Sequence, residues 1–198
     1  MTVDQINYTQ SIGLVPINNQ RRKERLSVLT ETERESYRKA IGQLNWVATH
    51  TRPDIAYDVC ELSVSMKSST VENLLHLNKL IRRAKTDNFR LCFPSLYPMR
   101  DCKLECYSDA AFANLPDEGS QGGYVIFLRS YKRCPIAWQS KKIKRVVKSA
   151  LAAETMACLE CAEAAVYIAE IMAEVTGMPK MKISVFVDSK SLIDNLQT

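Results

Sequence analysis

Three acidic residues in the second half of the chain have the residue types and settings of a divalent-metal site. Asp109 ends the segment LECYSD, which alternates as a strand does, and Asp188 ends the apolar segment KISVFVD. Glu154 lies in the first turns of a long predicted helix. Two strand ends and a helix start can meet at one edge of an α/β sheet, and a set of carboxylate oxygens suits Mg²⁺ or Mn²⁺. We therefore expect these three residues to bind metal and to carry the chemistry of the chain.

Each of these acids, taken alone, also has an ordinary explanation. Aspartates are common at strand ends, and the position of Asp188 directly before Ser189 is compatible with a helix cap. Glu154 is harder to explain in this way, because it lies on the apolar stripe that also contains Ala157 and Cys161. An unpaired carboxylate facing a core costs on the order of several kcal/mol unless it is paired or binds a metal. The combination of the three acids is therefore what indicates a metal site.

The charges around these acids separate by sign along the sequence. Eight basic residues and no acidic residue lie in the range 129–148, whereas five glutamates and no basic residue lie in 149–179. Cations that hold phosphates next to carboxylates that hold metal would suit an enzyme acting on polyanions. A solvated loop followed by an ordinary helix explains the same pattern, so charge alone leaves both interpretations open. The candidates for phosphate contact are Lys141, Lys142, Lys144, Arg145 and Lys148.

The second half of the sequence predicts an α/β fold. Period-two alternation and β-branched residues indicate strands, and a long stretch that stops before Gly177 and Pro179 indicates a helix. The order is three strands, a helix, a strand and a final helix. The continuous apolar character of 182–188 is typical of a strand buried on both faces. Strands are expected at 104–109, 122–128, 135–140 and 182–188, helices at 150–175 and from Ser189 onward, and an additional strand at 89–93.

The first half predicts a small all-helical segment, residues 1–87. Thr30 with Glu33 has the form of a capping box, and Thr70 is suited to cap a later helix. Apolar residues recur at helical spacing on three successive segments, whereas the first thirty residues look irregular. The residues expected to face inward are Tyr37, Ile41, Leu44 and Ala48, then Ile55, Val59, Leu62 and Met66, and finally Leu74, Leu77 and Ile81.

Composition excludes several classes of protein. With 198 residues, 46% of them hydrophobic and 25% charged, the chain can form one globular domain plus a smaller segment. No apolar run approaches the roughly 20 residues that span a bilayer, and the N-terminus lacks the features of a signal peptide. We therefore expect an intracellular protein, cytoplasmic or nuclear, that does not bind membranes. Cys158 and Cys161 form a C-x-x-C inside a predicted helix without a second pair, so buried thiols are favoured over a zinc or redox site.

A resemblance to a known family rests on six segments: YRKAIGQLNWVATHTRPDIAYDV, YSDAAFAN, GGYVIFL, WQSKK, ALAAETMACLECAEAA and VFVDSKSLIDN. The second, third, fifth and sixth resemble the strands and helices of the ribonuclease H fold, with the Asp, Glu and Asp in matching order, and the string WQSKK is similar to one that recurs in the narrower family named next. More narrowly, the chain is similar to the ribonuclease H region of copia-type LTR retrotransposon polyproteins, preceded by the connection region that follows their reverse transcriptase. The resemblance covers residues 30–198. It implies a helical connection segment at 1–87 and a ribonuclease H-like domain at 88–198.

This resemblance implies a ribonuclease H-like mixed sheet with helices, and a two-metal mechanism at Asp109, Glu154 and Asp188. Two Mg²⁺ or Mn²⁺ ions would bridge the scissile phosphate, one activating water and the other stabilising the leaving oxygen. The implied substrate is the RNA strand of an RNA–DNA hybrid, recognised by groove shape and 2′-hydroxyls, and the implied partner is the rest of a retrotransposon polyprotein. In the family the fold continues with a fifth strand and a final helix that carries a fourth metal-associated residue. The chain stops at Thr198, so we expect a C-terminally truncated domain.

Two other interpretations stay open. A catalytically inactive fragment could act as a nucleic-acid or protein binding module, and salt-sensitive hybrid binding without cleavage would support it. An integrase or transposase core also uses three acids, but its third is generally a Glu on a later helix, whereas the Glu here comes second. No two aspartates are adjacent in the sequence, so the chain is not by itself a reverse transcriptase.

Overall fold

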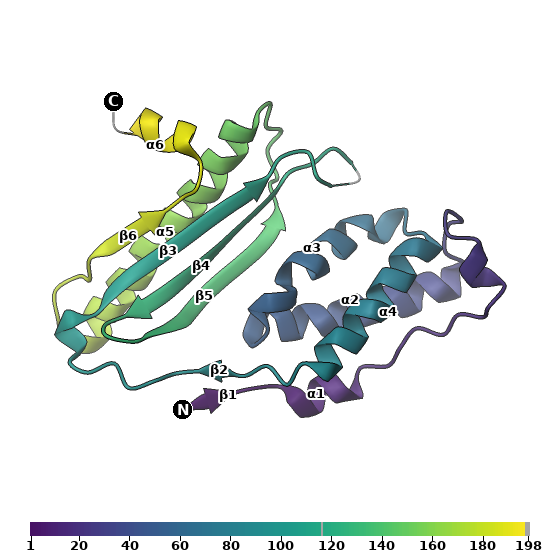
Figure 1. Ribbon diagram of the computed structural model, residues 1–198, viewed down its shortest axis with the longest axis horizontal. Coiled ribbons are helices and arrows are strands. Elements are labelled where there is room, and N and C mark those ends of the chain that lie inside the picture. The colour runs from purple at the N-terminus through teal and green to yellow at the C-terminus, as the bar shows by residue number, and fades with distance from the viewer. Residues whose placement is uncertain (116, 197–198) are drawn as a thin grey trace. The chain divides into compact units, whose positions relative to one another are not determined.

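The computed structural model describes residues 1–115 and 117–196, which divide into two compact units (Figure 1). One unit is the helical segment Val3–Leu91, and the other runs from Cys92 onward and includes the first two residues. Residues 197 and 198, which close the expected second domain, lie outside the described part of the chain. The assignment of 1–87 to a connection segment and of 88–198 to a ribonuclease H-like domain stays a prediction, because a division by contacts does not reveal a unit's origin.

The helical unit is formed by three long helices and one short one. Thr30 begins α2 with the expected capping box, since its hydroxyl accepts from the Glu33 amide and the Glu33 carboxylate accepts from the Thr30 amide. Thr70 begins α4 in the same way, with Asn73 in the second role. The helices are α1 (Ile6–Ser11), α2 (Glu31–His50), α3 (Ala56–Val64) and α4 (Val71–Thr86), with 3₁₀ turns at Arg21–Lys23, Pro53–Ile55 and Ser65–Lys67.

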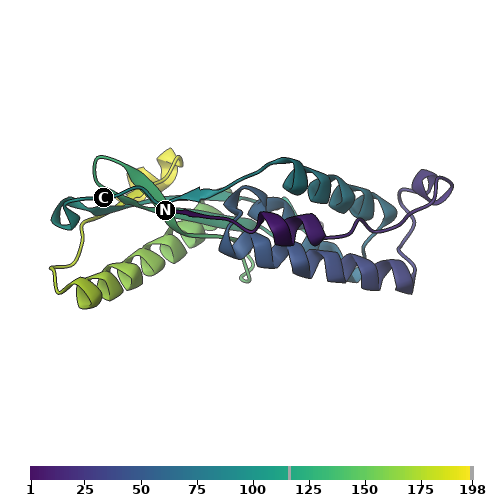
Figure 2. The same ribbon diagram turned by 90° about the horizontal axis from the view of Figure 1, so that it is seen from below.

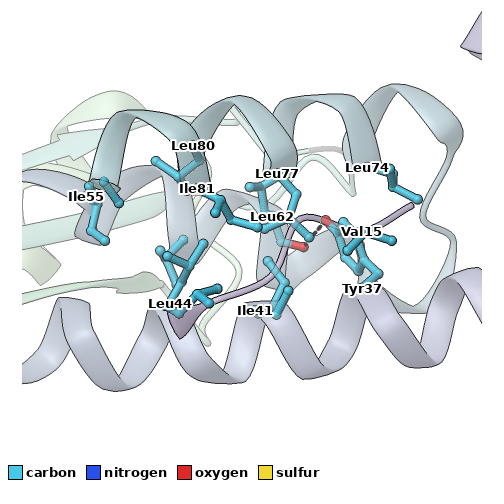
Figure 3. Close-up of a cluster of buried hydrophobic side chains, with 14 of the residues drawn as sticks. Val15, Tyr37, Ile41, Leu44, Ile55, Leu62, Leu74, Leu77, Leu80 and Ile81 are labelled. Carbon is cyan, nitrogen blue, oxygen red and sulfur yellow. Dashed lines mark hydrogen bonds between the residues drawn. The ribbon is translucent and has the colours of Figure 1, made fainter. Parts of the chain in front are cut away.

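The core of this unit is the apolar layer shared by α2, α3 and α4 (Figure 3). Tyr37 is fully buried in it, and its hydroxyl donates a hydrogen bond of 2.9 Å to the carbonyl of Leu62. Burial raises the pKa of Tyr37, so its hydroxyl stays protonated and remains a donor. Ten of the eleven residues expected to face inward are buried, and the remaining one, Met66, is half-buried against the same cluster. The predicted helical periodicity is therefore confirmed.

Arg52 ties the turn after α2 to the end of α4. Its side chain is only 4% exposed and forms a two-pronged ion pair with Asp54, with both N–O distances 2.8 Å. Its remaining Nη1 donates to the carbonyls of Ala84 and Asp87, at 2.8 and 3.2 Å, and the guanidinium lies 5.5 Å from the ring centre of Phe89. These carbonyls lie at the C-terminal end of α4, where the helix itself leaves them without a partner. The side chain of Arg52 thus caps the C-terminal end of α4 by donating to carbonyls that have no backbone partner in the helix.

The second unit is a mixed α/β structure built on a four-stranded sheet of order β5-β4-β3-β6. Strands β3, β4 and β5 are antiparallel neighbours, whereas β6 runs parallel to β3 (Figure 1). Helix α5 packs along one face of the sheet against β3 and β4 (Figure 2), and it ends at Gly177, whose φ of 65° suits glycine. The elements are β3 (Lys103–Ala111), β4 (Gln121–Arg129), β5 (Arg133–Lys142), α5 (Ala150–Thr176), β6 (Ile183–Phe186) and α6 (Lys190–Leu196).

Three sequence expectations need correction. The first thirty residues are not wholly irregular, because they contain α1 and the short strand β1 (Thr2–Val3). The strand expected at 89–93 is reduced to β2 (Leu91–Cys92), which pairs with β1 outside the four-stranded sheet. The strand expected at 182–188 is reduced to β6, an edge strand that pairs only with β3 among the described residues. Phe186 is 44% exposed there, so the expected burial on both faces was wrong. A run of apolar residues indicates a strand, but it does not show whether the strand has paired strands on both sides or lies at the edge of the sheet.

Among the described residues, no helix is both long enough and apolar enough to cross a membrane.

We expect Arg52→Ala to lower the free energy of unfolding of the helical unit by about 3 kcal/mol, because it leaves Asp54 unpaired and two carbonyls without a donor. Urea denaturation can be followed by the fluorescence of Trp46 in a Trp138→Phe background, since these are the two tryptophans of the chain. The exposed Arg38 on α2 provides the control, and Arg38→Ala should change stability little. Equal denaturation midpoints for the two variants would contradict the capping role.

Candidate metal centre

The structure brings Asp109, Glu154 and Asp188 together at one end of the sheet. One carboxylate oxygen from each residue lies within 4.8 Å of those from the other two, and no other such group of His, Cys, Asp and Glu occurs among the described residues. Asp109 belongs to β3, Glu154 to the first turns of α5, and Asp188 to the link between β6 and α6. The two aspartates are exposed and the glutamate is half-buried. The gathering is a structural fact, whereas its role as a metal site stays a prediction.

Strand pairing explains why the two aspartates meet. Tyr107 pairs with Phe186 at the end of the parallel ladder between β3 and β6, and each strand reaches its aspartate two residues later. Parallel strands carry their following residues to the same sheet edge, so equal offsets place Asp109 and Asp188 side by side. Ser189 begins α6 directly afterwards, and its hydroxyl accepts from the Leu192 amide at 3.4 Å. The helix cap is thus Ser189, which leaves the Asp188 carboxylate for the site.

Glu154 is electrostatically strained in the absence of a cation. Burial raises the pKa of its carboxyl, the negative charges of Asp109 and Asp188 raise it further, and the neighbouring backbone amide of Ala110 offsets part of this effect. Its Oε2 atom is buried and has no hydrogen-bond partner. A hard divalent cation would give this oxygen a partner and offset the repulsion among the three carboxylates. The donor set, all carboxylate oxygen, fits Mg²⁺ or Mn²⁺.

Glu105, on the same strand as Asp109, shows what a buried carboxylate looks like when the protein itself neutralises it. It is 1% exposed, yet Arg129 Nη1 lies 2.6 Å and Lys103 Nζ 3.2 Å from its Oε1. Burial alone would raise its pKa, but the hydrogen bonds from these two cations lower the pKa of Glu105 on balance. Glu154 has no such cationic partner among the described residues. Both glutamates have a buried Oε2 atom without a hydrogen-bond partner, so the difference between them is the pair of cations beside Glu105. The charge of Glu154 has no such cation from the protein, which is what a metal ligand requires.

The five predicted phosphate-binding residues fall into two groups. Lys141 Nζ lies 3.0 Å from Glu160 Oε2, and Lys142 forms an ion pair with Asp117. These two lysines are therefore already engaged with acids of the same unit. The other three, Lys144, Arg145 and Lys148, are exposed in the segment that leads into α5, and none has an ion-pair partner among the described residues.

The chain is similar to segments of three polyproteins encoded by plant transposons. It is 38% identical over 125 residues to the retrovirus-related Pol polyprotein from transposon RE1 of Arabidopsis thaliana, which covers 62% of this chain and 8% of that protein. It is 35% identical over 119 residues to the RE2 polyprotein of the same plant, with 60% and 8% covered. The TNT 1-94 polyprotein of Nicotiana tabacum is 29% identical over 160 residues, which is 80% of this chain and 11% of that protein.

The homologues of this chain are retrovirus-related Pol polyproteins from transposons. No protein-family model matches the sequence. The chain spans about a tenth of the length of each of these Pol polyproteins, so what the whole polyproteins do is not thereby assigned to it. The resemblance to a retrotransposon polyprotein is confirmed at this level, and its ribonuclease H part stays a prediction.

Sequence reasoning missed two features of the structure around Glu154. One is the backbone amide of Ala110, which no side-chain pattern reveals. The other is Gly122, which pairs with Ala110 across β3 and β4. The paired glycines at the start of GGYVIFL are visible in the sequence, but only the register shows which of them faces α5.

We expect Glu154→Gln to stabilise the metal-free chain, because it removes a charge that burial and two aspartates disfavour. In EDTA at pH 8 the midpoint of thermal unfolding, followed by circular dichroism, should rise by about 2 °C or more.

The raised pKa of Glu154 also determines how the stability of the folded chain changes with pH. Between pH 4.5, the ordinary value, and the raised folded-state pKa, the folded state binds more protons than the unfolded chain. Wild-type stability should therefore fall relative to Glu154→Gln as pH rises through this window, with a constant gap above it.

The exposed Glu163 of the same helix offers a matched control, and Glu163→Gln should show neither effect. A Glu154→Gln variant that melts at or below the wild-type midpoint at pH 8 would show that the carboxylate is not strained.

Proposed function

We propose that this chain contains a ribonuclease H-like domain of a copia-type retrotransposon polyprotein, which hydrolyses the RNA strand of RNA–DNA hybrids with divalent metal. The observation that carries this proposal is the meeting of Asp109, Glu154 and Asp188, with one Glu154 oxygen buried and unpartnered. Their order along the chain, strand, helix and strand end, matches the order that the resemblance implies. The sheet order β5-β4-β3-β6 with a parallel β6 is compatible with that fold.

The three carboxylates would hold two divalent ions, which when bound supply an activated water and stabilise the leaving oxygen. Asp109 lies on the central part of the sheet between β4 and β6, so it is the best candidate to contact both ions. The Oε2 atom of Glu154 is buried without a hydrogen-bond partner, so it is available as a metal ligand. Asp188 follows the end of β6 and is exposed, so it would bind metal from the solvent-facing side of the site.

The exposed cations before α5 suit a polyanionic substrate. Lys144, Arg145 and Lys148 carry three positive charges in the segment that ends at the first turn of the helix bearing Glu154. Such charges contact phosphates without reading sequence, whereas discrimination of a hybrid from plain DNA requires contact with the groove shape and the 2′-hydroxyls. Lys141 and Lys142 are already paired with Glu160 and Asp117, so we assign them a weaker part in binding.

Replacing Asp109 with Asn should lower hybrid cleavage by at least about 100-fold, because the amide keeps the shape of the carboxylate but not its charge. The full chain is incubated with an end-labelled RNA–DNA hybrid in Mg²⁺ or Mn²⁺, and cleavage of the RNA strand is followed on a denaturing gel. Plain DNA duplex and EDTA serve as negative controls, and Glu163→Gln as the matched variant.

Unchanged cleavage by Asp109→Asn would refute the assigned site. If the wild-type chain binds the hybrid in a salt-sensitive way but cleaves nothing in either metal, the chain is a binding module instead.

The exposed cations should each contribute to the salt dependence of hybrid binding. The test uses three single variants of the metal-free chain, Lys144→Gln, Arg145→Gln and Lys148→Gln. Each should make the negative slope of the logarithm of the association constant against the logarithm of the salt concentration less steep, by up to about 0.9. Fluorescence anisotropy at several salt concentrations measures this slope. Lys132, exposed in the turn between β4 and β5, is the control and should leave the slope unchanged. Equal slopes for all four variants would mean that the segment before α5 does not contact phosphate.

A further inference from the structure

Gly122 marks the place where α5 lies against the backbone of the sheet. A Cβ atom built on this residue would lie 3.3 Å from Cβ of Ala157 and 3.4 Å from Cγ1 of Ile143. Carbon atoms at optimal contact are separated by about 3.5–4.0 Å, so a side chain at 122 would push one of these neighbours away. The helix thus occupies the space that a side chain would need.

Backbone conformation does not explain why a glycine stands at this position. Gly177 is the only glycine with a positive φ in the described part of the chain, so Gly122 has a conformation open to other residues. A glycine inside a strand weakens the strand and often marks a close approach of another segment. At Gly122 the approaching segment is the helix that carries Glu154.

The helix contributes small residues to the same contact. The face of α5 turned to the sheet consists of buried residues at every fourth position, namely Ala153, Ala157, Cys161, Ala165 and Ala169. Ala157 lies three residues after Glu154, so the two are neighbours on the helix surface. On the sheet side, Gly122 pairs with Ala110, whose backbone amide lowers the pKa of Glu154. The contact between Gly122 and Ala157 is therefore about one helical turn from Glu154 and directly across the sheet from Ala110.

We propose that Gly122 is a positioning residue for the metal centre, because its missing side chain lets α5 approach β3 and β4 closely enough for Glu154 to reach Asp109 and Asp188. This inference rests on the proposed function, since it takes the three carboxylates to be metal ligands. A methyl group at 122 displaces Ala157 by a few tenths of an ångström, and the displacement carries Glu154 away from the aspartates. Metal constellations tolerate shifts of only about 0.5 Å, so this change matters.

The test is the affinity of the full chain for Mn²⁺, measured by electron paramagnetic resonance well below the melting temperature. Gly122→Ala should weaken binding by roughly three- to ten-fold, given that misplacement by 1 Å costs about 100-fold in function. Ala157→Gly makes room for the new methyl group, so the double variant should regain most of the wild-type affinity. It should do so although a glycine in the helix interior lowers stability, and this separates positioning from a general loss of stability.

Gly123→Ala is the matched control on the neighbouring residue. A Cβ there would lie 3.1 Å from the carbonyl oxygen of Gln139 on β5, so Ala157→Gly should not compensate for this variant. Ala157→Ser probes the same contact from the helix side, and it should also weaken Mn²⁺ binding if Gly122→Ala does not fold.

Three results would overturn the inference. Wild-type Mn²⁺ affinity in Gly122→Ala would show that the contact does not position Glu154. Ile143→Ala removes both Ile143 atoms that lie close to the new methyl group. Rescue of Gly122→Ala by Ile143→Ala but not by Ala157→Gly would show that Ile143, and not the helix, is displaced. A wild-type chain that binds no Mn²⁺ would refute the proposed metal site together with the inference, whereas the first two results leave the proposed function standing.

Discussion

The distance between α5 and the sheet governs the geometry of the α/β unit, and small residues on both sides set that distance. Alanines and Cys161 face the strands from the helix, and Gly122 meets Ala157 without a side chain of its own. Alanine and glycine bury less apolar surface than leucine would at the same positions, so this layer contributes less to the free energy of unfolding. Within the same unit, a carboxylate oxygen of the half-buried Glu154 lies within 4.8 Å of one from Asp109 on β3 and one from Asp188, which follows β6.

The same unit contains a buried carboxylate, Glu105, whose charge is stabilised and a half-buried one, Glu154, whose charge is not. Glu105 receives hydrogen bonds from Arg129 and Lys103, so its charged form fits the fold. Glu154 lies beside one backbone amide, that of Ala110, and beside the negative charges of Asp109 and Asp188. The pKa of its carboxyl is therefore raised, and the fold disfavours its charged form. Natural proteins commonly retain such locally unfavourable arrangements where function requires them. The position of this strain, at the end of a sheet and beside an exposed basic segment, supports the proposed nuclease over a purely structural role for the acids.

Features with a local cause could be predicted from the sequence, and features set by distant residues could not. The capping box at Thr30 and the cap at Thr70 depend on residues within three positions, and the structure contains both. Helix α1 has neither a side-chain cap nor an acidic first turn, so its sequence gives no signal. The three acids were found because the sequence places each near the start or end of a predicted element, although β3 continues two residues beyond Asp109 and β6 ends two residues before Asp188. The Ala110 amide and Gly122 depend on strand register and helix packing, which a single sequence does not contain.

The parallel pairing of β3 with β6 has a consequence for how this unit folds. Strands β3 and β6 are separated in the sequence by β4, β5 and the whole of α5, so the three carboxylates meet only through long-range contacts. The unfolded chain therefore offers no preassembled site, and a cation that needs all three acids binds the native state alone. By mass action such a ligand shifts the folding equilibrium by RT ln(1 + [L]/Kd). The cellular concentration of divalent metal would then affect how much of this chain is folded as well as what it does.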